Sequence, residues 1–163
     1  MKKRKSCIML AILMIWGLVL ANVALATDTV LHSFEGGAND GASPFGDLII
    51  SDGYLYGMTS IGGGVGCTDG CGTIFKIATT GGAINLLYSF TGGNDGATPT
   101  GSLILGGDGY LYGMTSSGGG GGFGTIFKIS TTDGTFTLIH TFNGGANDGA
   151  SPRGSLILDG GNL

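Results

Sequence analysis

Tyr54-Leu55-Tyr56-Gly57-Met58-Thr59-Ser60 returns letter for letter as residues 110–116. An Asp-Gly pair precedes each copy, and a run of glycines follows it. Phe34, Phe90 and Phe142 mark equivalent positions, 56 and then 52 residues apart. A tandem repeat with a period of this length is typical of solenoids, propellers and arrays. We therefore expect units that bury their apolar residues against one another.

Each repeat is predicted to contain four short strands. Apolar runs alternate with turn signals such as Asp52-Gly53, a tight hairpin pair. No segment after residue 26 has helical apolar spacing with caps, so no helix is expected. The predicted strands are 48–50, 54–59, 73–77 and 84–90 in the first repeat, and 103–105, 110–115, 125–129 and 135–142 in the second.

This pattern predicts an all-β fold, a partial β-propeller built of four-stranded antiparallel blades. Blades stack face to face, so both faces of each sheet are buried, and Gly57 and Gly113 suit the crowded part of a blade. The alternative is a β-solenoid, whose rungs are usually shorter than this repeat.

The two ends of the repeat region read as partial repeats. Thr29–Phe34 matches a fourth strand and Leu156–Leu158 a first strand. We therefore expect residues 27–163 to be one tandem β-repeat region of about two whole and two partial repeats, truncated at the C-terminus. The exposed strand edges of such a fragment favour self-association.

The first 26 residues have the pattern of a secretory signal peptide. Lys2–Lys5 form a basic region, an apolar run extends from Cys7 to about Leu20, and Ala24-Leu25-Ala26 supplies small residues at the cleavage site. Cleavage is expected before Thr27, which places the protein outside the cell, on the cell surface or in the periplasm. The alternative is a retained membrane anchor, since the apolar run is just long enough for one.

Without residues 1–26 the chain is acidic and rich in glycine. It keeps three of the seven basic residues and all eleven acidic ones, a formal net charge of −8. So few cations provide no electrostatic surface for nucleic acid or an anionic membrane. The 36 glycines are mixed with short β-rich runs, which favours a fold dense in turns over disorder.

Four motifs resemble the GloVer (Gloeo_Verruco) tandem-repeat family: Leu31–Phe34, Asn39–Pro44, Asp52–Gly57 and Gly72–Ile77. The resemblance covers nearly all of residues 29–163. It implies a bacterial exported protein with a propeller fold and, usually, a C-terminal surface-sorting anchor, a pattern not seen here, as expected of a truncated chain. The Asp-Gly-x-Leu-aromatic-x-Gly piece also resembles the two-component-regulator propeller repeat. Neither resemblance supplies catalytic residues.

Cys67 and Cys71 lie in the loop by which the first repeat exceeds the second. In an exported chain a local disulfide is the leading interpretation, and it closes so short a loop that its entropic contribution is small. The alternatives are free thiols or a zinc site. Zinc needs about four donors, whereas His32 and His140 occupy strand positions elsewhere in the repeat.

The most function-like feature is a recurrent Asn-Asp-Gly loop. Repeated Asn and Asp oxygens are ligands that calcium accepts. The alternative is turn chemistry, in which the side chain bonds nearby backbone and glycine takes a positive φ. One carboxylate per loop is too few for a calcium site without help, so no cofactor is assigned. The candidate residues are Asn39, Asp40, Asn94, Asp95, Asn147 and Asp148.

No catalytic motif can be assigned. Gly119–Gly124 matches G-x-G-x-x-G by count alone, but a strand follows it where a dinucleotide site needs a helix. The sequence contains no G-x-S-x-G, H-E-x-x-H or P-loop motif. His32 and His140 are equivalent and Tyr88 lies between them in repeat order, an exchange that indicates aromatic packing and not a general base.

These observations favour a non-enzymatic secreted or cell-surface repeat protein that binds a protein, a glycan or another copy of itself. Nearly identical repeats support this, because an asymmetric catalytic site usually needs one repeat to diverge. The alternative is a fragment of a secreted propeller enzyme that acts on glycans, with its catalytic residues in missing blades. Such an enzyme requires two convergent carboxylates, whereas the acids here recur mainly at turns.

Overall fold

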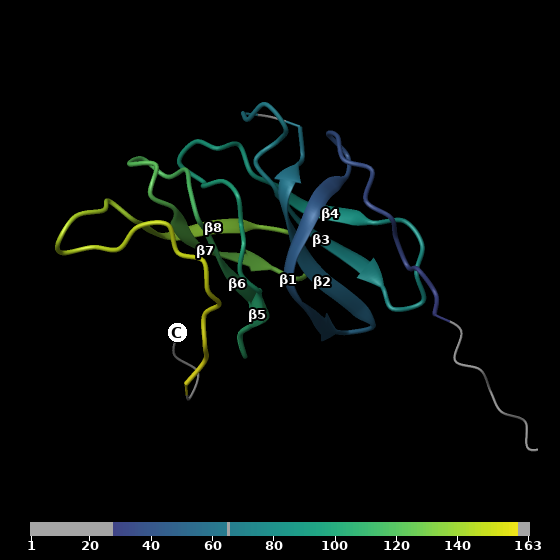
Figure 1. Ribbon diagram of the computed structural model, residues 1–163. Helices are drawn as coiled ribbons and strands as arrows, with labels where there is room; N and C mark the ends of the chain where they lie inside the picture. Colours follow the sequence, from purple (N-terminus) through teal and green to yellow (C-terminus); the bar gives the residue numbers. More distant parts are fainter. Residues whose placement is uncertain (1–27, 65, 160–163) are drawn as a thin grey trace, which may run out of the picture.

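The computed structural model describes residues 28–64 and 66–159, so the predicted signal peptide and its cleavage site lie outside the described residues. The described residues form eight β-strands and no helix, which confirms the predicted all-β fold. In this part of the chain no helix is long and apolar enough to span a membrane. The strands make two four-stranded antiparallel sheets (Figure 1), and neither sheet closes on itself.

Each sheet is a meander in which consecutive strands are neighbours. The first repeat supplies β1 (Gly41–Ser51), β2 (Tyr54–Gly62), β3 (Thr73–Ala78) and β4 (Asn85–Ser89). The second repeat supplies β5 (Ile104–Leu105), β6 (Tyr110–Thr115), β7 (Thr125–Ser130) and β8 (Phe136–Thr141). The prediction of four strands per repeat is thus confirmed.

The first strand of the first repeat is much longer than predicted. β1 begins at Gly41, not at Leu48, and runs along the edge of its sheet with a bulge after Phe45. This added segment contains Pro44 and Gly46. Proline is tolerated at sheet edges and bulges, so this segment still pairs with β2.

Two predicted strands are not formed. Residues 29–34 and 156–158 have irregular backbone and do not pair with another strand among the described residues. A fourth-type strand pairs with a third-type strand, and a first-type strand with a second-type strand. Neither partner is present among the described residues, and these segments therefore have no ladder to join.

The core lies between the two sheets. We call the face of each sheet that carries its third-strand phenylalanine the front face, and the opposite face the rear face. The rear face of the first sheet packs against the front face of the second. The buried residues at this joint include Tyr56, Met58 and Ile74 from the first sheet and Leu103, Leu111, Phe127 and Ile129 from the second.

Aromatic rings fill the joint at its outer edge, where β4 and β8 lie. The ring of Tyr88 stacks on that of Phe136 with centroids 4.2 Å apart. Phe90, which follows β4, meets Phe127 at 5.3 Å. These rings hold the two sheets apart at this edge.

The joint is much thinner at its inner edge, formed by β1 and β5. A Cβ atom on Gly46 would clash with the carbonyl oxygen of Gly101, so only backbone separates the repeats there. The amide of Asp47 donates to Ser102 Oγ at 2.8 Å, and the amide of Ser102 donates to Ser155 Oγ at 2.9 Å. The same contact thus links three successive repeats, and the joint between the sheets is a wedge.

The glycine of the Tyr-Leu-Tyr-Gly motif makes room for an aromatic ring. Gly113 lies opposite Phe127 in the sheet. A Cβ atom there would lie 2.6 Å from the Phe127 ring and 3.0 Å from Leu103. Gly57 has the same relation to Phe75, at 2.6 Å. Both glycines therefore occupy the crowded part of their sheets, as the sequence predicted.

We expect Gly113→Ala to lower the free energy of unfolding by about 1–3 kcal/mol, because overpacking a close-packed core shifts its neighbours. Gly107→Ala is the matched control, since nothing lies within 4 Å of a Cβ atom at Gly107. Urea unfolding followed by fluorescence measures both variants. Equal stability of the two would contradict the packing described here.

Candidate functional site

The Asn-Asp-Gly loops turn their carboxylates toward the protein. Asp40 accepts hydrogen bonds from the amides of Glu35 and Gly41, both at 2.8 Å, and its carboxylate lies 3.1 Å from His32 Nε2. The preceding Asn39 is exposed. The carboxylate thus closes the turn that leads into β1.

The loop after the second repeat has the same arrangement. Asp148 accepts from the amides of Asn143 at 2.9 Å and Gly149 at 2.8 Å, and it lies 3.2 Å from His140 Nε2. The Asn143 amide is the main cause of a lowered pKa for the Asp148 carboxyl group.

Tyr88 takes the place of the histidines in the loop between the two repeats. Its hydroxyl donates to Asp95 at 3.1 Å, and Thr91 supplies an amide at 2.8 Å and a hydroxyl at 2.6 Å. Burial and the nearby Asp95 raise the pKa of Tyr88 to about 12. The exchange of His for Tyr therefore preserves a polar contact to the carboxylate as well as an aromatic ring, and sequence reasoning had identified the ring alone.

The bonds at Asp40 make the fold sensitive to acid. Burial alone would raise the pKa of Asp40, but the Glu35 amide, His32 and the Gly41 amide lower it below its ordinary value. A carboxyl group with a lowered pKa in the folded state adds stability above its unfolded pKa of about 3.9. This stability is lost as the pH falls through the folded pKa.

We therefore expect the Tm to fall as the pH is lowered from about 5 to about 2. Asp40→Asn should lower stability by about 1 kcal/mol at pH 7 and make the decline in acid shallower. Asp28→Asn, at an exposed position, is the control and should keep the wild-type slope. Calorimetry across this pH range measures both, and an unchanged slope in Asp40→Asn would refute the role of Asp40.

Among the described residues, no group of three or more His, Cys, Asp or Glu side chains lies close enough to hold a metal ion. The loop carboxylates are each bound to backbone amides instead. Turn chemistry stays the leading interpretation of these loops, and calcium binding stays the alternative.

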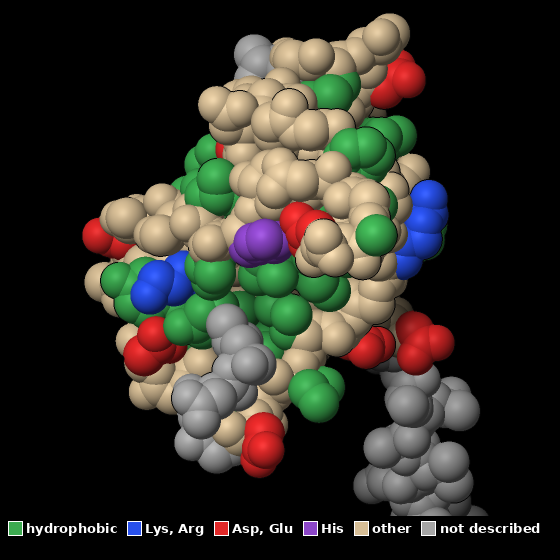
Figure 2. Space-filling view, turned by 90° about the vertical axis from the view of Figure 1, so that its left-hand side faces the viewer, with side chains coloured by type: hydrophobic (Ala, Val, Ile, Leu, Met, Phe, Trp, Pro, Cys, Tyr) green, Lys and Arg blue, Asp and Glu red, His purple; other side chains and the backbone are tan. Residues whose placement is uncertain are grey.

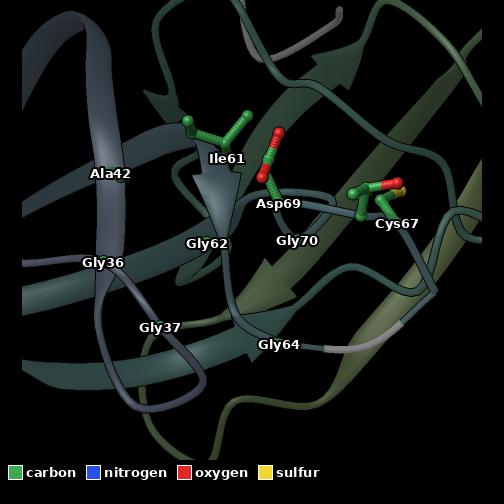
Figure 3. A pocket seen from close by; sticks show the side chains of 10 residues that line it. Gly36, Gly37, Ala42, Ile61, Gly62, Gly64, Cys67, Asp69 and Gly70 are labelled. Atoms are coloured by element: carbon green, nitrogen blue, oxygen red, sulfur yellow. The ribbon is translucent and has the colours of Figure 1, made fainter.

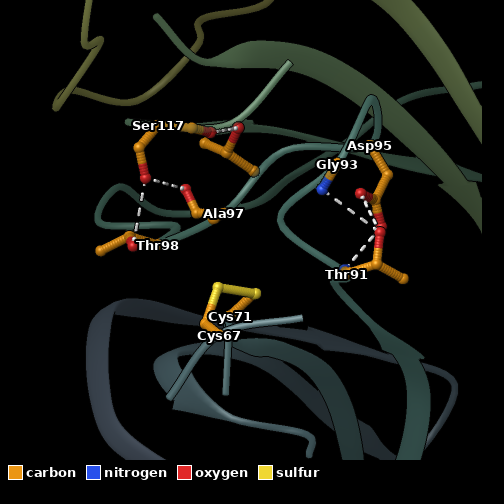
Figure 4. Close-up of a disulfide and its surroundings, with 9 residues drawn as sticks. Cys67, Cys71, Thr91, Gly93, Asp95, Ala97, Thr98 and Ser117 are labelled. Carbon is orange, nitrogen blue, oxygen red and sulfur yellow. Dashed lines mark hydrogen bonds between the residues drawn. A yellow bond between two sulfur atoms is a disulfide. The ribbon is translucent and has the colours of Figure 1, made fainter. Parts of the chain in front are cut away.

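Cys67 and Cys71 are joined by a disulfide, with their Cα atoms 5.3 Å apart (Figure 4). Cys71 is fully buried, and its carbonyl oxygen accepts a hydrogen bond from the Thr98 amide at 2.8 Å. Both sulfur atoms lie so close to Gly92 that no side chain would fit there. The bridge therefore holds the inserted loop of the first repeat against the start of the second.

The second repeat uses an aromatic ring in the same position. Phe123 is the counterpart of Cys71, and its carbonyl oxygen accepts a bond from the Ser151 amide at 2.7 Å. The ring of Phe123 packs beside Gly144, where a Cβ atom would lie 3.1 Å from the nearest ring carbon. The disulfide loop is therefore the main local difference between two otherwise similar repeats.

The disulfide loop and the first Asn-Asp-Gly loop enclose a cavity of about 350 Å³ (Figure 3). Glycine backbone forms most of its wall, and Ala42 and Ile61 add apolar carbon. Two exposed polar side chains, Thr68 and Asp69, also line it. Among the lining residues Asp69 is the one carboxylate.

Backbone hydrogen bonds fix the shape of this cavity. The Gly62 amide donates to the Asp69 carbonyl at 2.8 Å, and the Gly63 amide donates to the Gly37 carbonyl at 2.9 Å. A wall made of glycine backbone carries no side-chain motif, so sequence reasoning missed the cavity. The signal that could have found it was the extra length of the cysteine loop.

The described lining of the cavity combines apolar carbon with one carboxylate, that of Asp69. Apolar carbon and the carboxylate of Asp69 can hold a ligand that presents both C–H faces and hydroxyl groups. Hydrolysis of a glycosidic bond needs a second carboxylate across the bond, and the described residues that line the cavity include none.

Comparison with known proteins identifies the repeat but no role. The family model described as Gloeobacter/Verrucomicrobia repeat matches residues 16–163, which confirms the resemblance drawn from the motifs. No curated protein and no solved structure is significantly similar to the chain.

Proposed function

Because the chain belongs to the Gloeobacter/Verrucomicrobia repeat family, we propose that its sheets are blades of an exported β-propeller that binds a glycan without catalysing a reaction. The wedge between the sheets supports a propeller over a solenoid. Parallel layers keep a spacing of about 10 Å. Here the repeats meet backbone to backbone at Gly46 and Gly101, while the rings of Tyr88 and Phe136 separate them at the outer edge.

The observation that carries the binding role is the disulfide loop. The two repeats share their strands and turns but differ at this loop. The inserted loop of the first repeat lines a cavity of about 350 Å³. Binding sites are concave, largely pre-formed and lined by apolar groups with a few polar ones. Ile61 and Ala42 offer the apolar part, and Asp69 and Thr68 offer hydrogen bonds to sugar hydroxyls.

A glycan array probed with the full chain tests this proposal. Asp69→Ala is expected to weaken binding about 10- to 100-fold, the effect of losing a hydrogen bond to a charged group. Asp133→Ala is the control, because this exposed carboxylate lies in the turn before β8 and outside the cavity. An array without a bound glycan, or equal affinity of Asp69→Ala and the wild type, would overturn the proposal.

Export has its own test, since it rests on residues 1–26 alone. N-terminal sequencing of protein recovered from outside the cytoplasm should begin at Thr27. A chain that still begins at Met1 would contradict cleavage.

A further inference from the structure

The front face of the first sheet is half covered. Near the inner edge Leu48 is 53% exposed, whereas its counterpart Leu103 in the second sheet is 1% exposed. Near the outer edge Phe75 and Ile77 are buried, at 4% each. One part of a neighbouring sheet therefore lies over the first sheet, and another part is missing.

The part that is present is the segment 29–34. The rings of Phe34 and Phe75 lie 5.2 Å apart at an angle of 64°. In the joint between the sheets, Phe90 and Phe127 lie 5.3 Å apart at the same angle of 64°. Residues 29–34 thus sit on the first sheet as β4 and Phe90 sit on the second.

The missing part leaves an apolar cavity. It measures about 340 Å³ and is lined by Leu31, Leu48 and Leu55 among others. In the joint between the two sheets, the counterparts of Leu48 and Leu55 are covered by the rear face of the first sheet, which carries Met58 and Ile74. The uncovered part of the front face therefore lies where the first three strands of a neighbouring sheet would pack, without the fourth.

We propose that residues 29–33 are the fourth strand of a further sheet, whose other three strands belong to a partner with the same repeat sequence. The partner is a three-stranded sheet that lacks its own fourth strand. If the partner sheet had its own fourth strand, that strand and residues 29–33 would compete for the same position. The partner's rear face would cover Leu48 and Leu55, and its third strand would pair with the open edge of residues 29–33.

The internal repeats define the register of this pairing. In the first sheet Thr73 faces Ser89, Ile74 faces Tyr88 and Phe75 faces Leu86, with a bulge between the last two pairs. The second sheet has the same register and the same bulge. The partner's Thr-Ile-Phe strand should therefore place its Thr opposite Ser33, its Ile opposite His32 and its Phe opposite Val30.

This inference rests on the proposed propeller arrangement and not on glycan binding. The glycan array tests binding at the disulfide loop, whereas strand pairing is measured at residues 29–33. Each can therefore fail while the other stands.

The test supplies this partner covalently, as further copies of the second repeat added to the C-terminus of the full chain. Lengths that give four to eight sheets cover the range of propeller rings. In one series the last copy ends after its third strand, at the counterpart of Ser130. In the matched series it continues through the fourth strand, to the counterpart of Phe142.

At one length of the three-strand series, we expect the amides of residues 29–33 to exchange with deuterium about 100-fold more slowly than in the unextended chain. Alkylation of a Leu48→Cys variant should slow about 10-fold at the same length. The four-strand series should show neither change. The inference is overturned if no length protects residues 29–33, or if both series protect them equally.

Discussion

Replacing Phe127 with alanine is expected to lower the free energy of unfolding by about 3–5 kcal/mol. Phe127 is fully buried, and its ring lies 5.3 Å from those of both Phe90 and Phe136. It also fills the space above Gly113, which has no side chain to move into the void. A typical domain is stable by about 5–15 kcal/mol, so this variant loses a large share of its stability.

Phe45→Ala is the matched control for this prediction. Phe45 is 53% exposed, so its truncation should change stability by less than about 1 kcal/mol. Urea unfolding of the three proteins gives the comparison. Equal losses in the two variants would show that the stabilising core does not lie between the sheets.

Gly124→Ala is expected to lower the free energy of unfolding by about 2–6 kcal/mol. Gly124 has a φ of 98°, and such backbone strain contributes about 1–3 kcal/mol in a residue with a side chain. A Cβ atom there would also clash with the carbonyl oxygen of Thr115 and lie 2.9 Å from Pro152. Overpacking of this kind adds about 1–3 kcal/mol.

Gly122→Ala separates the two contributions. Gly122 also has a positive φ, 80°, but nothing lies within 4 Å of a Cβ atom at this position. This variant should lose about 1–2 kcal/mol, the strain alone. If calorimetry gives the same Tm for both variants, the close approach of the third repeat at Pro152 does not contribute to stability.

The sequence predicted the strands of the sheets because its local signals and the fold agree. Asp52 and Gly53 have φ values of 49° and 80°, as a two-residue hairpin requires. Tyr56 and Met58 lie on one face of β2 and are buried together, which the alternation of a strand predicts.

The candidate site was less predictable because backbone builds it. The cavity depends on the path of the disulfide loop and on glycine contacts, and neither is expressed in a side-chain pattern. The buried hydroxyl pair of Thr59 and Thr73, 2.7 Å apart, was also missed, since threonine is common in strands without such a partner. The segment 29–34 has a strand sequence but an irregular backbone, because no strand pairs with it among the described residues.

Hydrophobic side chains are exposed on the side of the molecule that carries the second repeat (Figure 2). Leu138 and Ile139 of β8 are 40% and 46% exposed. On the first sheet the counterpart β4 is covered by the second sheet, with Tyr88 on Phe136. The strand β8 at the edge of the second sheet is therefore less covered than its counterpart β4 in the first sheet.

The ring stack of Tyr88 and Phe136 can be regarded as a spacer, and the glycine contact at Gly46 as a pivot. In a ring of blades, the difference in thickness between spacer and pivot sets the angular step from one blade to the next. A full turn divided by that step is the number of blades. The size of such a ring would then depend on the volume of a few aromatic side chains at the outer edge. His140, at the position of Tyr88, would make the next step slightly different.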